Sequence, residues 1–261
     1  EGKYFFWDRY NYGLDTHFYG PESLTKTLGN PQVKYGMLTE SRAIVPQDYE
    51  VFRRHKGLEK EFRYIFTYDE TILNEIENAR FYPICARVWY GQDNQFLWDS
   101  DAYLKKSRDV SVLSSAKTMC HLHEVRVELS RYCKRNCLAD TFGTFDGGAP
   151  CLADDSLRDY RYSIIIENDI SDYFFTEKIT NCFAAQTIPV YLGARKIDRY
   201  FDGDGIIAVT EKDLANIEDV LKMCTRENYE ARLPAVLRNF EKVREYVNMQ
   251  DYLYEHYLMK K

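Results

Sequence analysis

Residues 162–193 read YSIIIENDISDYFFTEKITNCFAAQTIPVYLG, and this stretch decides the fold. It opens with an apolar run, which is typical of a parallel strand buried on both faces. Residues 176–186 then carry apolar side chains at helical spacing. A second apolar run follows over residues 188–192 and ends at Gly193. The order strand, loop, helix, strand is that of a βαβ unit in a nucleotide-binding sheet.

Strands and helices alternate over the rest of the chain as well, which favours an α/β fold with layers of helices on a sheet. Further strands are predicted over residues 3–7, 33–38, 64–68, 86–90, 110–113 and 206–209. Further helices are predicted over residues 123–133, 210–221, 235–247 and 251–259. Thr210 and Asp213 resemble a capping box, and Pro234 is expected just ahead of the helix at 235, where proline is tolerated. Residues 13–31 are expected to form a loop.

The length of 261 residues suits two domains of roughly 100–150 residues each. We predict an N-terminal domain over residues 1–108 and a C-terminal domain over residues 109–261, with the linker in the polar segment 99–109. The net charge of −6 lacks the electrostatic footprint of a general nucleic-acid binder, so no nucleic-acid partner is expected.

The seven cysteines are scattered, and no second pair of Cys or His completes a zinc site with Cys133 and Cys137. No Asn-x-Ser/Thr sequon occurs, and no apolar run approaches the roughly 20 residues of a membrane span. These features predict reduced thiols, no transmembrane segment in this chain and a cytoplasmic location. A membrane anchor removed from the region before Glu1 is left open.

The polar segment 167–178, ENDISDYFFTEK, is where chemistry is expected. It begins at the carboxyl end of a buried strand, where open α/β sheets bind ligands. It ends at a helix start, whose free N–H groups attract anions such as phosphate. Lys178 could pair with such an anion, and the Glu177 carboxylate could accept hydrogen bonds from sugar hydroxyls. The alternative from these residues alone is an ordinary helix start with a solvated lysine.

Several motifs together resemble the signature of the α1,3/4-fucosyltransferases. They are Glu167-Asn168, Thr176-Glu177-Lys178, Ile188-Pro189-Val190 and Gly193, with a loop and a helix between them. A weaker likeness extends from Asp109 to the C-terminus, and the first 108 residues show only scattered likeness. The resemblance implies the GT-B fold, in which two Rossmann-like domains face a cleft. It also implies an inverting transfer of L-fucose from GDP-fucose, bound by the C-terminal domain, to a glycan hydroxyl.

The resemblance implies four donor contacts in this chain. Lys178 would contact the diphosphate, Glu177 would hold the ribose, and Asn168 would line the sugar–phosphate site. Arg126 matches an arginine on the first helix of the family's donor domain that also contacts phosphate, and its planar fork suits phosphate oxygens. The alternative for Arg126 is a surface arginine on an amphipathic helix.

The chain departs from the family two residues before Thr176, where the family has tyrosine. That position holds Phe174 here, and Tyr173 lies one residue earlier. We hypothesise that Tyr173 substitutes for the missing hydroxyl at the donor site. The departure also motivates an alternative donor, such as UDP-xylose or another GDP- or UDP-sugar.

The family's general base follows a strand in the N-terminal domain, and Glu40, after the predicted strand 33–38, is the best match. It would take the proton of the acceptor hydroxyl; the alternative is a glutamate solvated in a loop. The expected partners are a nucleotide sugar and an oligosaccharide or glycoconjugate acceptor. We expect no tightly bound cofactor and no essential metal.

Two further readings stay open. Asp99 and Asp101 form an Asp-x-Asp pair of the kind that holds a divalent metal in another class of glycosyltransferase. The second reading is a carbohydrate- or nucleotide-binding protein that has no catalytic activity. His121 and His123 lie two residues apart with no third ligand in view, so we expect an exposed or internally satisfied pair.

Overall fold

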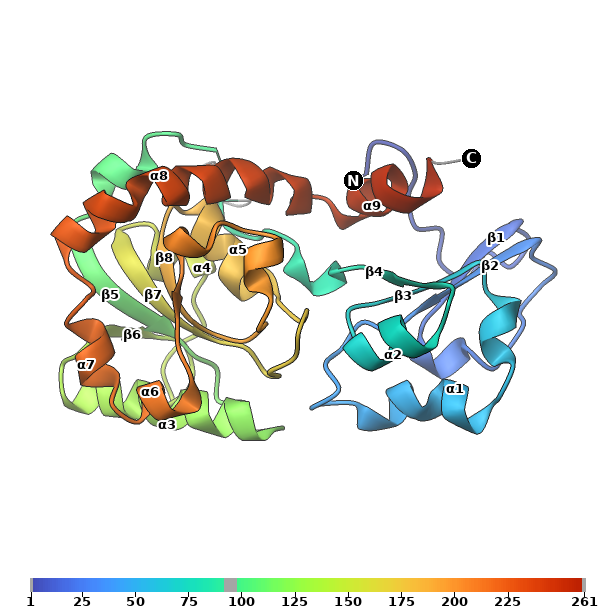
Figure 1. Cartoon of the computed structure of the whole chain (residues 1–261), viewed down its shortest axis with the longest axis horizontal. Helices are drawn as coiled ribbons and strands as arrows, with labels where there is room; N and C mark the ends of the chain where they lie inside the picture. Colours follow the sequence, from blue (N-terminus) through green and yellow to red (C-terminus); the bar gives the residue numbers. More distant parts are fainter. Residues whose placement is uncertain (1, 92–97, 260–261) are drawn as a thin grey trace.

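The structure is a computed structural model that describes residues 2–91 and 98–259. Two parallel β-sheets lie side by side, each with its own helices (Figure 1). The C-terminal sheet has the strand order β6-β5-β7-β8-β9. Its strands are β5 (Arg108–Leu113), β6 (Asp140–Phe142), β7 (Tyr160–Ile166), β8 (Ile188–Leu192) and β9 (Ile207–Ala208). The strands predicted in this half are confirmed; β6 was not predicted.

Strand β7 is buried on both faces, as its apolar run predicts. Tyr162, Ile164 and Ile166 belong to a core that includes side chains of α3 and α7. Ile165 points the other way, into a core with side chains of α4 and α5. The helices of this domain are α3 (His121–Arg135), α4 (Ala153–Leu157), α5 (Glu177–Ala184), α6 (Glu211–Leu214), α7 (Ile217–Leu221) and α8 (Arg226–Lys242).

Two helix predictions need correction. The single helix expected over residues 210–221 is divided into α6 and α7, although the capping box of Thr210 and Asp213 is present. Helix α8 starts earlier than predicted, because the Thr225 side chain accepts a hydrogen bond from Asn228 N and caps it. Pro234 therefore lies inside α8 and not at its first turn. Proline in a helix interior removes one backbone hydrogen bond.

The N-terminal sheet has the strand order β1-β2-β3-β4 and is also parallel. Its strands are β1 (Thr16–Tyr19), β2 (Val33–Met37), β3 (Tyr64–Thr67) and β4 (Ala79–Phe81), and its helices are α1 (Val51–Arg54) and α2 (Glu70–Glu75). The predictions of β2 and β3 are confirmed. Strand β1 lies in the stretch 13–31 that was predicted as loop, and β4 was not predicted. Residues 3–7 and 86–90 are not strands, which corrects those two predictions.

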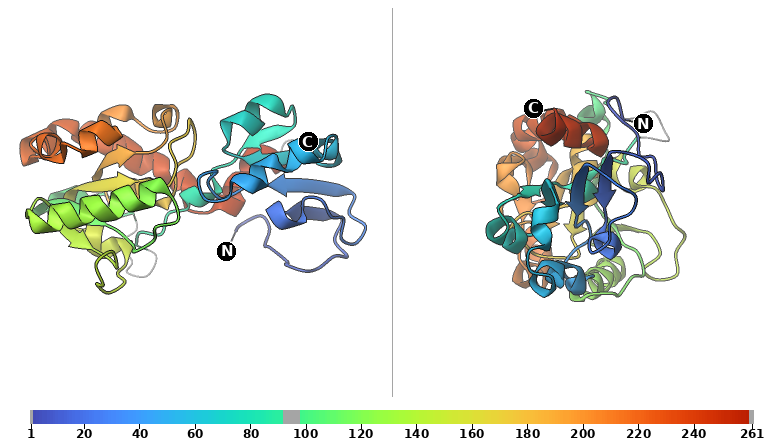
Figure 2. Two further views of the ribbon diagram at one scale, coloured as in Figure 1. Left: turned by 90° about the horizontal axis from the view of Figure 1, so that it is seen from below. Right: turned by 90° about the vertical axis from the view of Figure 1, so that its right-hand side faces the viewer.

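The chain crosses between the domains twice, and the two crossings touch. The first follows β4, and the second runs from the end of α8 to α9 (Met249–Leu253), which lies beside the N-terminal sheet (Figures 1 and 2). Val88 N donates to Tyr246 O at 3.2 Å, and the Tyr82 hydroxyl donates to Met249 O at 2.8 Å. One apolar core contains side chains from both domains and both crossings.

A π-helical turn, Tyr254–Leu258, follows α9 near the end of the chain. Throughout the described residues, the helices are too short or too polar to span a lipid bilayer.

Candidate active site

The site is organised around Glu167, the first residue after β7. Its side chain is fully buried and accepts hydrogen bonds from Thr176 N at 2.9 Å and Thr176 Oγ1 at 2.7 Å. It also accepts one from Lys178 Nζ at 3.1 Å. Gly193 leaves room for this carboxylate, because a Cβ atom there would lie 2.6 Å from Glu167 Cγ. The motif residues Glu167, Thr176, Lys178 and Gly193 therefore form one packed unit.

Lys178 lies in the first turn of α5, which Thr176 caps through its side chain. Its Nζ donates to Thr176 Oγ1 at 2.8 Å and lies 3.6 Å from Glu177 Oε1. Burial by itself lowers the pKa of Lys178, but the carboxylates of Glu167 and Glu177 outweigh it and the pKa is raised. Lys178 is therefore a cation, and 27% of its side chain is exposed toward an incoming ligand.

Arg126 and His123 lie one turn apart on α3, and both side chains are buried. Arg126 is buried and donates from Nη1 to Ile166 O at 3.1 Å, while its Nε has no hydrogen-bond partner among the described residues. Burial lowers the pKa of Arg126, and the negative charge of Glu167 opposes that shift. His123 is also buried, and its Nδ1 accepts a hydrogen bond from Met119 N at 3.3 Å.

His123 is held in its neutral form. Burial, together with the nearby cations Arg126, Lys178 and Lys117, lowers the pKa of His123 to about 4, and the charge of Glu40 opposes the shift. The imidazole therefore carries its proton on Nε2 and can donate one hydrogen bond there, because Nδ1 is an acceptor.

A cavity of about 380 Å³ lies against these groups. Arg126, Glu177 and Lys178 line it, so the structure brings together three of the residues predicted to hold the donor. The remaining lining residues are Trp89, Leu113, Cys151, Leu152, Ala153, Asp154, Ser156, Leu157, Ser163, Ile164, Ile165, Ile166 and Asn181. The two cations at one wall suit a polyanionic ligand such as a diphosphate.

Glu40 faces this region from the N-terminal domain. It is exposed and lies in the loop after β2. Its Oε1 accepts hydrogen bonds from Ser41 N at 2.7 Å and from Asn168 Nδ2 at 3.3 Å. Asn168 is thus next to both the predicted base and the buried Glu167, and its Oδ1 has no partner among the described residues. The contact bridges the two domains.

Tyr173 and Phe174 lie outside the lining of this cavity. Phe174 is 1% exposed and packs in the N-terminal core, with its ring centroid 4.4 Å from that of Tyr68. The Tyr173 hydroxyl accepts a hydrogen bond from Arg199 at 3.3 Å, and its ring packs against Phe81. Tyr173 and Phe174 belong to the loop between β7 and α5. In the described structure, both rings pack this loop against neighbouring elements.

The other predicted features lie elsewhere. Asp99 is paired with Lys105 at 2.5 Å and also caps Asp101 N at 3.0 Å. Within residues 2–91 and 98–259, no three His, Cys, Asp or Glu side chains are grouped as a metal site would require. His121 is exposed and lies 2.6 Å from Glu211, whereas His123, two residues further along α3, is buried.

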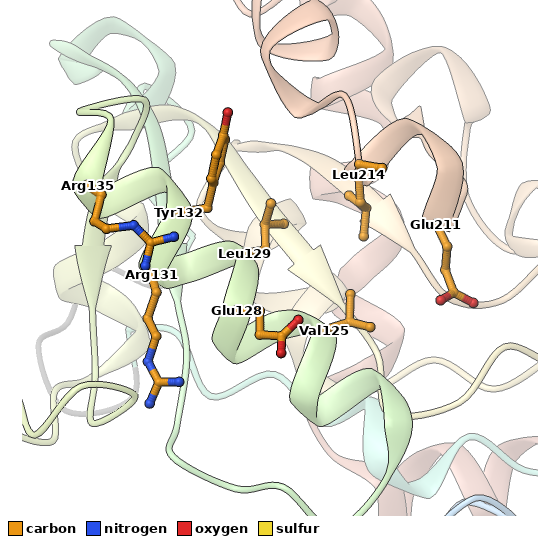
Figure 3. Close-up of a pocket in the computed structure, with 9 residues that line it drawn as sticks. Val125, Glu128, Leu129, Arg131, Tyr132, Arg135, Glu211 and Leu214 are labelled. Atoms are coloured by element: carbon orange, nitrogen blue, oxygen red, sulfur yellow. The ribbon is translucent and has the colours of Figure 1, made fainter.

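A larger cavity of about 580 Å³ lies on the surface between α3 and α6 (Figure 3). Its lining residues are Val125, Glu128, Leu129, Arg131, Tyr132, Arg135, Glu211, Leu214 and Ala215. None of the predicted site residues lines it, and Arg126 points from the same helix into the other cavity. We therefore take the smaller cavity as the candidate active site.

Sequence reasoning gave no role to Glu167 and regarded His123 as unremarkable. Glu167 had a usable signal, because a glutamate between a buried strand and a polar loop requires a cationic partner, and Lys178 follows in the same motif. His123 had no such signal, since its burial depends on the approach of α3 to residues distant in sequence.

Comparisons with known proteins agree with this geometry. Residues 104–232 match the family model for the C-terminal part of glycosyltransferase family 10 (fucosyltransferase). No curated protein matches the chain. An α1,3-fucosyltransferase structure with GDP shares 14% identity and a TM-score of 0.54, covering 89% of this chain and 76% of the other. The structure of an α1,3-fucosyltransferase with GDP-fucose shares 13% identity, a TM-score of 0.54 and the coverage of 89% and 76%.

The structural likeness confirms the predicted GT-B fold, with two Rossmann-like domains. The family match confirms the resemblance that the motifs indicated, and it falls on the part of the chain that carries Arg126, Glu177 and Lys178. Residues 104–232 of this chain are therefore similar to the C-terminal part of glycosyltransferase family 10, the fucosyltransferases, and the chain is a glycosyltransferase.

Proposed function

We propose that this enzyme transfers L-fucose from GDP-fucose to a hydroxyl of an oligosaccharide or glycoconjugate, with inversion at the sugar carbon. The observation that carries the proposal is the cavity wall formed by Arg126, Glu177 and Lys178, together with the hydrogen bond that joins Glu40 to Asn168, the residue after Glu167. The solved α1,3-fucosyltransferases of the same fold contain GDP or GDP-fucose, which supports the choice of donor.

In the proposed reaction, Glu40 takes the proton of the acceptor hydroxyl while the oxygen of that hydroxyl attacks the anomeric carbon of the donor sugar. The bond from that carbon to the phosphate oxygen breaks, and GDP leaves with the electron pair. Arg126 and Lys178 neutralise the charge that develops on the diphosphate, which stabilises the transition state. Glu177 would accept hydrogen bonds from the ribose, and Asn168 would lie at the sugar–phosphate junction. Because these two cations carry the charge, we propose that the reaction needs no metal and no tightly bound cofactor.

The donor is tested by measuring thermal shift and GDP or UDP release with GDP-fucose, GDP-mannose, UDP-xylose and UDP-galactose. Selective stabilisation by GDP and GDP-fucose, with slow release of GDP, is expected. Selective stabilisation by a UDP-sugar would overturn the fucose assignment and leave the glycosyltransferase family intact. A lack of response to all four would favour a binding protein without catalysis.

The base is tested with Glu40→Gln, which removes the proton acceptor and keeps the shape. We expect GDP release from GDP-fucose to fall by about 10²–10⁴-fold, with GDP affinity unchanged in calorimetry. The matched control is Glu75→Gln, which removes the same charge from an exposed position on α2 and should keep full activity. Retained release in Glu40→Gln would show that another group acts as the base.

The cytoplasmic location and the domain boundary between residues 108 and 109 stay proposals. Fractionation of the native source and limited proteolysis around residues 99–109 are the direct tests.

A further inference from the structure

The backbone carbonyl of Glu40 is held by two buried tyrosines. The hydroxyls of Tyr49 and Tyr68 both lie within hydrogen-bond distance of Glu40 O, and the Tyr49 hydroxyl is also within hydrogen-bond distance of the Tyr68 hydroxyl, at 2.8 Å. Tyr49 is 1% exposed and Tyr68 is 3% exposed. Three oxygen atoms from three separate segments of the N-terminal domain thus meet in the interior, directly beneath the residue proposed as the base.

These two hydroxyls can only act as donors toward that carbonyl in the working range of the protein. Burial raises the pKa of both Tyr49 and Tyr68 well above the usual range of a phenol, so both keep their protons. Each hydroxyl has one proton to give, and a carbonyl oxygen has two lone pairs. Tyr68 can donate its proton to Glu40 O, and Tyr49 can donate its own either to the same oxygen or to the Tyr68 hydroxyl. Either arrangement satisfies a carbonyl that would be costly to bury alone.

Each tyrosine is fixed from a different side. The Arg42 guanidinium lies over the Tyr49 ring at 4.6 Å from its centroid, and the same guanidinium holds Asp69 at 2.8 and 2.9 Å. The Tyr68 ring packs against Phe174 at 4.4 Å. Phe174 belongs to the loop between Glu167 and Lys178. Tyr68 is therefore in contact with the part of the chain that forms the proposed donor site.

We propose that Tyr49 and Tyr68 are positioning residues for the reaction, because they fix the backbone of Glu40 so that its carboxylate faces the cleft. This inference rests on the proposed function, in which Glu40 is the base. The Glu40 side chain is exposed and held by two hydrogen bonds, from Ser41 N and Asn168. A side chain so placed reaches an acceptor hydroxyl reproducibly only if its own Cα is fixed. A base must lie within hydrogen-bond reach of the proton it takes, and a displacement of about 1 Å can cost about 10²-fold in rate.

The inference is tested with Tyr49→Phe, Tyr68→Phe and the double variant, which remove hydroxyls and keep the rings. The readouts are GDP release from GDP-fucose, GDP affinity by calorimetry and thermal stability. Each single variant should lower kcat by about 3–10-fold and the double variant by about 30–100-fold, while GDP affinity changes by less than about twofold. The single variants keep one hydrogen bond to Glu40 O, so they remain informative if the double variant folds poorly.

Two controls separate positioning from general stability. Tyr229→Phe removes another buried hydroxyl, which donates to Gln186 O at 2.7 Å in the C-terminal domain, and should lower thermal stability without lowering kcat. In a Glu40→Gln background, the tyrosine substitutions should not reduce the residual GDP release further, because residues that act through one group are not additive.

The outcomes distinguish this inference from the proposed function. If Glu40→Gln loses activity but the double tyrosine variant keeps kcat within about twofold of the wild type, the inference is wrong and the proposed function stands. If the tyrosine substitutions reduce the residual release of Glu40→Gln as strongly as that of the wild type, their role is structural. If Glu40→Gln keeps its activity, the assignment of the base fails, and the inference fails with it.

Discussion

The two sides of the candidate site hold their functional groups by different means. On the C-terminal side, Arg126 and Lys178 are cations gathered around the fully buried carboxylate of Glu167. On the N-terminal side, Glu40 is exposed and its backbone is held by the neutral hydroxyls of Tyr49 and Tyr68. A site for an anion can keep two cations close together only with a buried counter-charge. A base that must take a proton is better left in contact with solvent.

The largest effect should follow from removing the counter-charge on the C-terminal side. Glu167→Gln would leave Lys178 and Arg126 without their buried partner, and breaking a buried ion pair costs about 3–5 kcal/mol. Denaturant unfolding of the variant measures this loss. Glu75→Gln, which breaks an exposed pair with Arg53 at 3.4 Å, should change stability by no more than about 1 kcal/mol. Equal losses in the two variants would contradict the contrast between the buried charges and the exposed ones.

A smaller effect should appear as a pH dependence of stability from His123. Its pKa is lowered to about 4 in the folded protein, whereas an unfolded histidine titrates near 6.5. The unfolded state therefore binds the proton first as the pH falls, and folding loses stability between about pH 6.5 and pH 4. Between pH 7 and pH 5, this group should account for about 2 kcal/mol.

The measurement is the free energy of unfolding of the wild type and of His123→Asn at each pH. Asparagine keeps an acceptor for Met119 N and does not titrate, so the variant should show the shallower slope. The same measurement on His121→Asn is the control, because His121 is exposed on the same helix. It separates the effect of removing a buried histidine from the effect of removing any histidine. Identical slopes for the wild type and His123→Asn would show that the pKa of His123 is not lowered in the folded protein.

The smallest effect on donor binding should come from restoring the family's residue in the loop between the two sides. Phe174→Tyr would place a hydroxyl in a core where the side chain is 1% exposed, at a cost of about 1–3 kcal/mol. Because Phe174 packs on Tyr68 and does not line the cavity, GDP-fucose affinity should not improve. A clear gain in affinity for GDP-fucose, measured by calorimetry, would show that residue 174 contacts the donor.

The sequence predicted the C-terminal domain better than the N-terminal one, for physical reasons. Strand β8 and the second half of β7 form continuous apolar runs because both faces of the sheet are covered, and such runs can be recognised from the sequence alone. Strand β1 includes a buried histidine and a buried tyrosine within a stretch rich in glycine and proline, and its alternation of buried and exposed residues is too short to stand out.

Residues 86–90 show why an apolar stretch can mislead. The backbone N–H groups of Trp89 and Tyr90 donate to Asn181 Oδ1 at 2.7 and 2.9 Å, so the segment is fixed by a side chain of the other domain and joins no sheet. Of the site, the sequence indicated Arg126, Glu177 and Lys178, which line one cavity, and Asn168 and Glu40, which are hydrogen-bonded to each other. The tyrosine pair beneath Glu40 could not be predicted, because a hydrogen bond to a backbone carbonyl leaves no pattern in the sequence.

The double crossing of the chain has a mechanical consequence. Two polypeptide links join the domains and touch through Val88 N and Tyr246 O, so a relative displacement of the domains would act on both links at once. Twisting or sliding would pull the links apart, and it would also separate the Tyr82 hydroxyl from Met249 O. The position of Glu40 relative to Asn168, which lies in the other domain, therefore depends on both links.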